Sequence, residues 1–157
     1  MHKFTIIQDS REQNPWDFSF YEKCKGVVVR KLETGDYSIE GLEDIVTIER
    51  KKSTGEMAIN IGKDGRRFNK ELVRMSQLKY KYLICEFSFD TLSNFPHGST
   101  IPSYQWSKLR ITPQYLVSRL LSYRDKYGIE VIFCNNSDEA NEKAIEVLEY
   151  VYTNEMV

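Results

Sequence analysis

The chain has 157 residues, of which 41% are hydrophobic and 29% are charged, and its formal net charge is −1. These values are typical of a soluble globular protein that forms one domain over residues 1–157. No apolar run approaches the ~20 residues that a membrane-spanning helix needs. Three isolated cysteines without histidines at ligand spacing argue against disulfides and zinc, and the N-terminus lacks a signal peptide, so we expect a cytoplasmic protein.

The first half of the chain is rich in β-branched and alternating apolar residues, which is typical of strands. Residues 4–9 (FTIIQD) and 26–32 (GVVVRKL) each predict one strand. Residues 36–41 and 44–51, separated by a turn at Gly41, predict a hairpin. This region therefore supplies most of a sheet.

The second half alternates between helical and strand patterns. Between residues 65 and 78, apolar residues recur at helical spacing with basic residues between them, which predicts an amphipathic helix. Thr112 followed by Pro113 is a good helix start, and Gly128 is a good helix end. The other expected elements are a strand over 81–89, a loop or short irregular helix over 93–111, a strand over 129–134 and a last helix capped by Ser137.

This order of elements predicts an α/β domain with a mixed central β-sheet covered by helices on both faces.

The charged residues are unevenly distributed along the chain. Between Glu49 and Tyr82 ten lysine or arginine residues stand against four acids, whereas the chain after residue 135 has six acids and one lysine. The basic segment fits an anionic partner on one face, and a solvated helix face is the alternative interpretation.

The strongest chemical signal is a pair of acids at the predicted hairpin. Asp36 begins one arm and Glu49 lies near the end of the other, so an antiparallel pair would bring them close. Lys51 follows two residues after Glu49 and therefore points to the same side of the strand. Two carboxylates can hold Mg²⁺, and a lysine beside them can orient water for phosphodiester hydrolysis. The alternatives are turn chemistry for Asp36 and an ordinary surface pair for Glu49 and Lys51.

Several ordered motifs extend this signal over nearly the whole chain. They are IIQDSREQNPWDF, LETGDYSI, TIERKKS, GRRFNKELVRM, YLICEF and SRLLSYRDKYGIEVIFCNNSDEA. In order and spacing they resemble the nuclease domain of the xeroderma pigmentosum group F (XPF) family, and most closely its compact bacterial and phage members. The resemblance implies a restriction-endonuclease-like fold.

The resemblance also implies roles for individual residues. Asp36 and Glu49 would bind Mg²⁺, for which Mn²⁺ would substitute, and the main-chain carbonyl of Arg50 would be a third ligand. Glu12 would bind the ion or lie beside it, and Asp9 would support the site, although salt bridging to Arg11 is an alternative for both acids. Lys51 would orient the water. The residues expected to contact DNA phosphates are Arg11, Lys52, Lys63, Arg66 and Arg67, with a solvated helix start as the alternative for the last two.

The sequence departs from the family pattern in two places. Where the family has a final acid, this chain has Gly55, and Glu56 comes one residue late, so its role is left open. No helix-hairpin-helix repeat follows the nuclease-like region, so any branch specificity is expected from residues 93–111, from a homodimer or from a partner protein. The expected dimer surface, for which core packing is an equal explanation, contains Tyr123, Tyr127, Val151 and Tyr152.

These patterns predict a Mg²⁺-dependent DNA endonuclease acting on branched or structured DNA. One alternative is a nuclease of relaxed specificity in bacterial or phage DNA metabolism, and another is a catalytically silent DNA-binding subunit. Glu86 matches an acid of the family and is expected to be structural. The sequence contains neither a phosphate-binding loop for nucleotide triphosphates nor a serine nucleophile elbow, so we expect no nucleotide cofactor.

Overall fold

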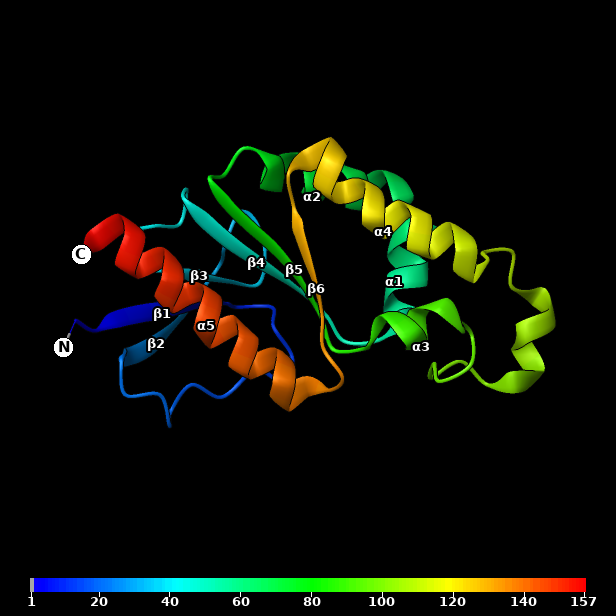
Figure 1. Cartoon of the computed structure of the whole chain (residues 1–157), viewed down its shortest axis with the longest axis horizontal. Helices are drawn as coiled ribbons and strands as arrows, with labels where there is room; N and C mark the ends of the chain where they lie inside the picture. The colour runs from blue at the N-terminus through cyan, green and yellow to red at the C-terminus, as the bar shows by residue number, and fades with distance from the viewer. Residues whose placement is uncertain (1) are drawn as a thin grey trace.

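The computed structural model describes residues 2–157 as a mixed six-stranded sheet between two layers of helices (Figure 1). Across the sheet the strand order is β2-β1-β3-β4-β5-β6. The strands are β1 (Phe4–Asp9), β2 (Cys24–Arg30), β3 (Tyr37–Ile39), β4 (Val46–Lys51), β5 (Tyr80–Cys85) and β6 (Glu130–Phe133). β3 runs antiparallel to both of its neighbours, and the other neighbouring pairs are parallel. The predicted mixed α/β sheet is therefore confirmed.

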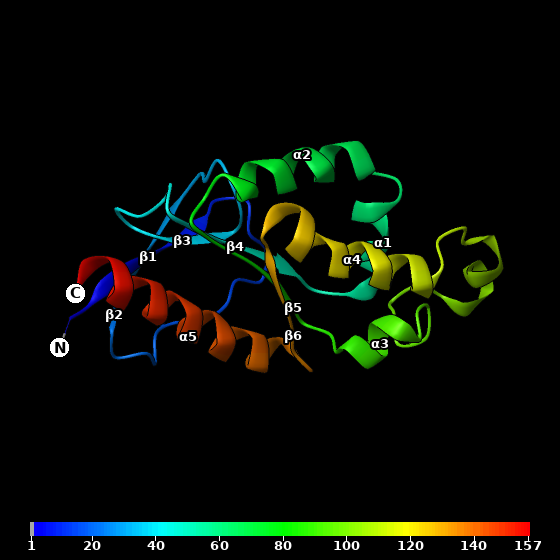
Figure 2. The same ribbon diagram turned by 45° about the horizontal axis from the view of Figure 1, so that its top comes forward.

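Five α-helices and one 3₁₀ helix connect or follow the strands in residues 2–157. They are α1 (Thr54–Ile61), α2 (Gly65–Ser76), α3 (Phe89–Ser93), η1 (Ser103–Lys108), α4 (Pro113–Tyr127) and α5 (Ser137–Met156). The helix α5 crosses one face of the sheet, and α1, α2 and α4 lie on the other (Figures 1 and 2). Within the described residues, no helix is both long enough and apolar enough to cross a bilayer.

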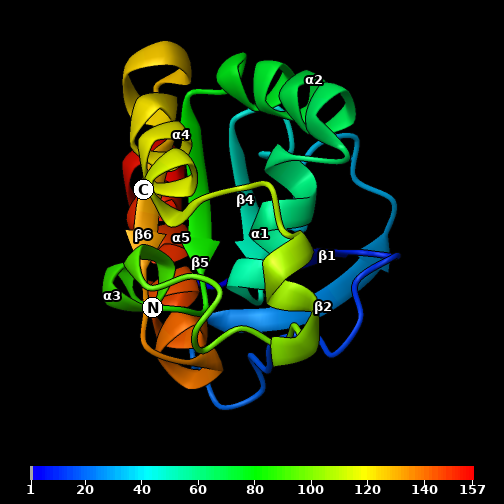
Figure 3. The same ribbon diagram turned by 90° about the vertical axis from the view of Figure 1, so that its right-hand side faces the viewer.

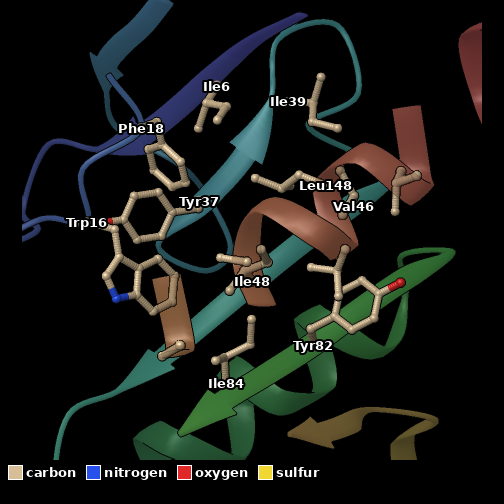
Figure 4. Packing of buried hydrophobic residues seen from close by; sticks show 14 of the residues in the cluster. Ile6, Trp16, Phe18, Tyr37, Ile39, Val46, Ile48, Tyr82, Ile84 and Leu148 are labelled. Carbon is tan, nitrogen blue, oxygen red and sulfur yellow. The ribbon is translucent and has the colours of Figure 1, made fainter. Parts of the chain in front are cut away.

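The core under α5 is built from alternate residues of the central strands (Figure 4). Ile6, Ile39 and Ile48 point into it and are fully buried. The ring of Trp16 stacks on the ring of Tyr37 with 4.8 Å between centroids, which closes the end of this core nearest the loop after β1. This packing anchors the loop to the sheet.

The second core lies between the opposite face of the sheet and the helices α1, α2 and α4. The helical spacing of Phe68, Leu72 and Met75 places all three on the buried side of α2, as the sequence predicts. Leu83 and Cys85 reach this core from β5 and are fully buried. The two cores thus take alternate residues of the same strands.

β4 shows this alternation and also carries charge. Val46 and Ile48 join the core under α5, so Glu49 and Lys51 point to the face covered by α1 and α2. All six residues of β4 are buried, including its last three charged residues. Because burying a charge is costly unless it is paired, these residues are where chemistry is most expected.

Several element boundaries differ from the sequence prediction. The strand expected over 81–89 ends at Cys85, because Ser88 accepts a hydrogen bond from Thr91 N and starts the short helix α3. The last helix is capped by Asn136, whose side chain accepts from Glu139 N, rather than by Ser137. The irregular segment contains the 3₁₀ helix η1, in agreement with the expectation of a loop or short helix.

The helix α4 begins and ends as predicted. Thr112 accepts a hydrogen bond from Tyr115 N, and Gly128 takes the left-handed conformation that a C-cap glycine favours. Tyr123 and Val151, which were considered for a dimer surface, are buried in the cores of the single chain. Core packing therefore explains these two residues.

Candidate active site

The turn before β3 sets the position of Asp36. Gly35 has a φ of +77°, and a Cβ atom there would lie 2.0 Å from Thr47 Oγ1, so only glycine fits. The next residue is drawn against β4, because Asp36 N donates to Ile48 O at 2.7 Å. The carboxylate then accepts a hydrogen bond from Arg50 N at 2.8 Å through Oδ2. Asp36 is thus fixed beside the end of β4 by both its backbone and its side chain.

Glu49 and Lys51 form an ion pair on the same face of β4. Lys51 Nζ lies 3.0 Å from Glu49 Oε2, and the two side chains are only 7% and 6% exposed. The ammonium group also lies 4.9 Å from the centroid of the Phe68 ring, so α2 covers it. An ordinary solvated surface pair, which was the alternative interpretation of these residues, is therefore wrong.

A polar cavity of about 220 Å³ brings most of the predicted site together. It lies where the loop after β1, the turn before β3, the end of β4 and the start of α1 meet. Its lining residues are Arg11, Glu12, Gln13, Asp36, Glu49, Arg50, Lys51, Lys52 and Glu56. Eight of these nine were named from the sequence, and only Gln13 was not.

The acids of this cavity are held in an environment that resists their ionisation. Burial, the nearby charge of Glu49 and that of Glu12 raise the pKa of Asp36 well above its usual value. Burial likewise raises the pKa of Glu49 to about 7, against the opposing effect of Lys51. The pKa of Lys51 is raised because the neighbouring carboxylates outweigh its burial. The site therefore concentrates negative charge that its own lysine does not fully offset.

Among residues 2–157, Glu49 Oε1 is buried without a hydrogen-bond partner, whereas Glu12 Oε2, which also lacks a hydrogen bond, lies 3.5 Å from the charged Arg50 Nη1. An unpaired buried carboxylate oxygen is costly, and a divalent cation that prefers hard oxygen ligands removes that cost. The donor set of Asp36, Glu49 and main-chain oxygen fits Mg²⁺ or Mn²⁺. Within residues 2–157 no three acid, histidine or cysteine side chains are gathered into a metal cluster, so the ligand role expected of Glu12 stays a prediction.

Arg50 points to the opposite face of β4, where its charge is fully paired. Its Nε donates to Glu86 Oε2 at 2.7 Å, its Nη1 donates to Asn14 O at 2.8 Å, and its guanidinium lies 4.7 Å from the centroid of the Trp16 ring. Glu86 Oε2 also accepts from Trp16 Nε1 at 2.7 Å. The carboxylate of Glu12 lies 3.5 Å from Arg50 Nη1. This network holds the loop after β1 against the sheet, and Glu86 has the structural position expected of it.

Asp9 and Arg11 form a separate bidentate pair. Arg11 Nε and Nη2 donate to the two Asp9 oxygens at 2.9 and 3.1 Å, and Leu32 N donates to Asp9 Oδ1 at 2.8 Å. Burial opposes ionisation of Asp9, but these hydrogen bonds outweigh it and keep its pKa below the usual value. Asp9 thus orients Arg11, which lines the cavity with a mostly exposed side chain. The salt bridge considered from the sequence is present.

Glu56 has a clear local role. Ser53 Oγ caps α1 by accepting a hydrogen bond from Glu56 N, and Glu56 Oε1 accepts one at 2.9 Å from Lys52 N, the residue before the cap. Glu56 also lines the cavity. The side chain of Lys52 is bound to Gln13 O and lies 3.7 Å from Glu12 Oε1. Lys52 therefore ties the loop after β1 to the start of α1.

The remaining basic residues lie outside the cavity. Lys63, Arg66 and Arg67 are exposed at and after the end of α1, and none of them forms an ion pair within the described part of the chain. Their predicted phosphate contacts and the solvated alternative both stay open. A residue that sequence reasoning missed is Glu71, whose charge opposes ionisation of Glu49. Its position three residues after Phe68, on the inward side of α2, is the signal that could have revealed it.

Comparison with known proteins agrees with the motifs. The family model of the ERCC4 domain matches residues 8–144. The solved structure of XPF from Aeropyrum pernix is 19% identical over 94% of this chain and 61% of that chain, with a TM-score of 0.66. A second structure, XPF from Aeropyrum pernix in complex with DNA, is 21% identical over 97% of this chain and 66% of that chain, with a TM-score of 0.64.

At these identities the two solved structures establish the fold alone, and they confirm the predicted α/β fold with a mixed sheet. The chain spans about two thirds of the length of each of them. No curated protein sequence matches the chain.

Proposed function

The chain belongs to the ERCC4 domain family, and from this premise we propose that it is a divalent-metal-dependent DNA endonuclease. Membership of the family supports a role in DNA cleavage or repair. The observation that carries the proposal is the convergence of Asp36 and Glu49 with Lys51, together with a buried Glu49 oxygen that has no partner in the described structure. A catalytically silent subunit would have no reason to keep this costly arrangement.

The proposed roles follow from what each side chain contacts. Asp36, Glu49 and the main-chain oxygen of Arg50 would hold Mg²⁺ or Mn²⁺, and Glu12 would contribute from the loop. When bound, the cation supplies Lewis-acid stabilisation of the phosphate charge and lowers the pKa of water. Lys51, held by Glu49, places an ammonium group at the cavity to orient the attacking water and offset negative charge. Arg11, held by Asp9, is aimed to bind an adjacent phosphate.

The proposed substrate is branched or structured DNA. DNA is supported by the likeness to a structure solved in complex with DNA and by the basic residues around the cavity. A nuclease of relaxed specificity is the alternative for the same site, and discrimination between DNA structures would then come from a second copy of the chain or from a partner protein. The exposed Arg66 and Arg67 are proposed to contact backbone phosphates in either case.

The test is a panel of end-labelled forked, flapped, nicked, single-stranded and plain duplex DNAs incubated with Mg²⁺ or Mn²⁺. We expect internal cuts by the wild-type protein and none by Asp36→Asn. Intact DNA throughout the panel with the wild-type protein would contradict the proposal. Equal cutting of forks and plain duplex would favour the nuclease of relaxed specificity.

A further inference from the structure

An apolar groove with a volume of about 730 Å³ lies away from the acids. One wall is α1 and the other is the segment that leads from η1 into α4. The helix α1 contacts α4, and Figure 3 shows the yellow-green segment that leads into α4 passing next to α1. We define the apolar groove by Ala58, Ile59, Gly62, Leu109, Ile111 and Tyr115.

Two large hydrophobic side chains of the apolar groove are about half exposed to solvent. Ile59 is 52% exposed and Tyr115 is 48% exposed, although both line a concave surface. The groove is closely packed at Gly62, where an added Cβ atom would lie 2.9 Å from Ala58 O and 3.3 Å from Ile111 Cδ1. A large exposed apolar concavity is typical of a binding site.

The charges around the apolar groove are all of one sign. Lys63, Lys108 and Arg110 line it, and no acidic residue does. All three are exposed, and none forms an ion pair within residues 2–157. An apolar surface bordered only by free cations matches a ligand with flat apolar faces and regularly spaced negative charges. An unpaired DNA strand has both, whereas a duplex hides its base faces in the stack.

The apolar groove and the catalytic cavity share α1 as a common wall. Glu56 lines the cavity, and its neighbour Gly55 lines the groove. From there the groove follows α1 to its end at Gly62, and eight helical residues span about 12 Å. At ~3.4 Å per stacked nucleotide this length accepts on the order of three nucleotides. The groove therefore begins within one residue of the cavity along α1.

We propose that the apolar groove binds the bases of an unpaired DNA segment while Lys63, Lys108 and Arg110 bind its phosphates. The proposal rests on the nuclease function proposed above, and it assigns the contacts with an unpaired segment to the apolar groove. Ile59 and Tyr115 supply the apolar surface against which bases pack. Specificity for structured DNA then has a physical basis within this chain.

The test compares variants by fluorescence anisotropy with labelled twelve-nucleotide oligothymidine and a labelled duplex of twelve base pairs. All proteins carry Asp36→Asn and are measured without divalent metal, so that cleavage does not interfere. The groove variants are Ile59→Asp and the double variant Lys108→Ala/Arg110→Ala. The matched controls on α4 are Leu121→Asp, whose native side chain is also 52% exposed, and Arg124→Ala/Lys126→Ala.

We expect each groove variant to lose at least ~10-fold in affinity for oligothymidine, since base packing and phosphate contacts contribute on this scale. The controls should change by less than twofold, and duplex binding should fall by less than threefold in every variant. Circular dichroism checks folding, and the double variant at exposed positions decides the result if Ile59→Asp does not fold.

Three outcomes would overturn the proposal. One is equal oligothymidine binding by groove variants and controls, which would leave the groove free for a protein partner. The second is an equal loss of single-strand and duplex binding, and the third is no oligothymidine binding by the parent protein. None of these depends on cleavage, so a failure of the proposed nuclease activity would be recognised separately by the panel of labelled DNAs.

Discussion

The buried charged side chains on the two faces of β4 differ in how completely they are paired. On the face toward α5, the guanidinium of Arg50 is paired with Glu86, covered by Trp16 and bonded to a main-chain carbonyl. On the face toward α1 and α2, Glu49 is paired with Lys51 through one oxygen, and its other oxygen has no hydrogen-bond partner in the described part of the chain. Of these two adjacent residues, Arg50 has its charge paired and hydrogen-bonded, whereas Glu49 has one carboxylate oxygen without a hydrogen bond in the described structure.

We infer that the face with Arg50 stabilises the fold, whereas the face with Glu49 is suited to binding a cation. A fully paired buried ion network stabilises only if every member is satisfied, which is the state of Arg50 and Glu86. Carboxylates that crowd together with a raised pKa destabilise the chain unless a cation joins them, which is the state of Asp36 and Glu49. Removing a charge near Glu49 should therefore mainly reduce cleavage, whereas removing the charge of Arg50 should mainly reduce stability.

The largest effect is expected on cleavage when the unsatisfied face is changed. Asp36→Asn keeps an oxygen that can accept from Arg50 N but removes one metal-binding charge. Metal-assisted hydrolysis supplies several kcal/mol of transition-state stabilisation, so the cleavage rate should fall by at least ~10³-fold with little loss of fold. Single-turnover cleavage and circular dichroism measure the two properties, and a rate within tenfold of wild type would contradict the assignment.

The next largest effect is expected on stability when the satisfied face is changed. Arg50→Met leaves Glu86 buried without its cation and leaves Glu12 with Lys52 alone, and removing one partner of a buried pair costs about 3–5 kcal/mol. Urea unfolding measures the loss. Arg124→Met, at an exposed position on α4, is the control and should change stability by less than ~0.5 kcal/mol. Equal stability of the two variants would mean that the Arg50 network does not support the fold.

A smaller effect is expected from pH on the metal-free protein. The pKa of Glu49 is raised in the folded state to about 7, and that of Asp36 is also raised, so folding binds protons that the unfolded chain has released. Stability should therefore fall as pH rises from about 4.5 to 7, by roughly 2 kcal/mol. Asp9, whose pKa is lowered from an ordinary value of 3.8, has largely completed its contribution below this window.

Urea unfolding at several pH values with a chelator measures this slope. In Asp36→Asn one of the two raised acids is absent, so the decline should be shallower. A stability that rises with pH across this window in the wild-type protein would show that the cavity acids are not held against ionisation.

The smallest effect is expected at Glu56, which belongs to the cavity and to the cap of α1. Glu56→Ala should cost about 1 kcal/mol, because it removes the side-chain acceptor of the hydrogen bond from Lys52 N beside the cap of α1. Glu56→Gln should restore that stability, since an amide oxygen can accept from Lys52 N. If cleavage falls ~10-fold or more in the Gln variant while stability is kept, Glu56 acts at the metal as well as in the cap.

Local chemistry explains which parts of the structure the sequence could predict. The strand β1 and the ends of α4 follow from alternation, Thr112 and Gly128, and the closeness of Asp36 to Glu49 follows from the hairpin. The boundary at Ser88 was missed because a cap interrupts an apolar run. The bond from Trp16 to Glu86 joins residues far apart in sequence, and the apolar groove combines α1 with a segment without periodicity. Such features depend on tertiary contacts that no local pattern encodes.

The central claim is that Asp36 and Glu49 together bind a divalent cation, and calorimetric titration with Mn²⁺ tests it most directly. Wild type, Asp36→Asn, Glu49→Gln and, as the matched acid on the satisfied face, Glu86→Gln are titrated after circular dichroism confirms that each is folded. We predict binding by wild type and Glu86→Gln, and affinity lowered at least ~10-fold in the other two. Equal Mn²⁺ affinity in all four proteins, or none in the wild type, would contradict the account.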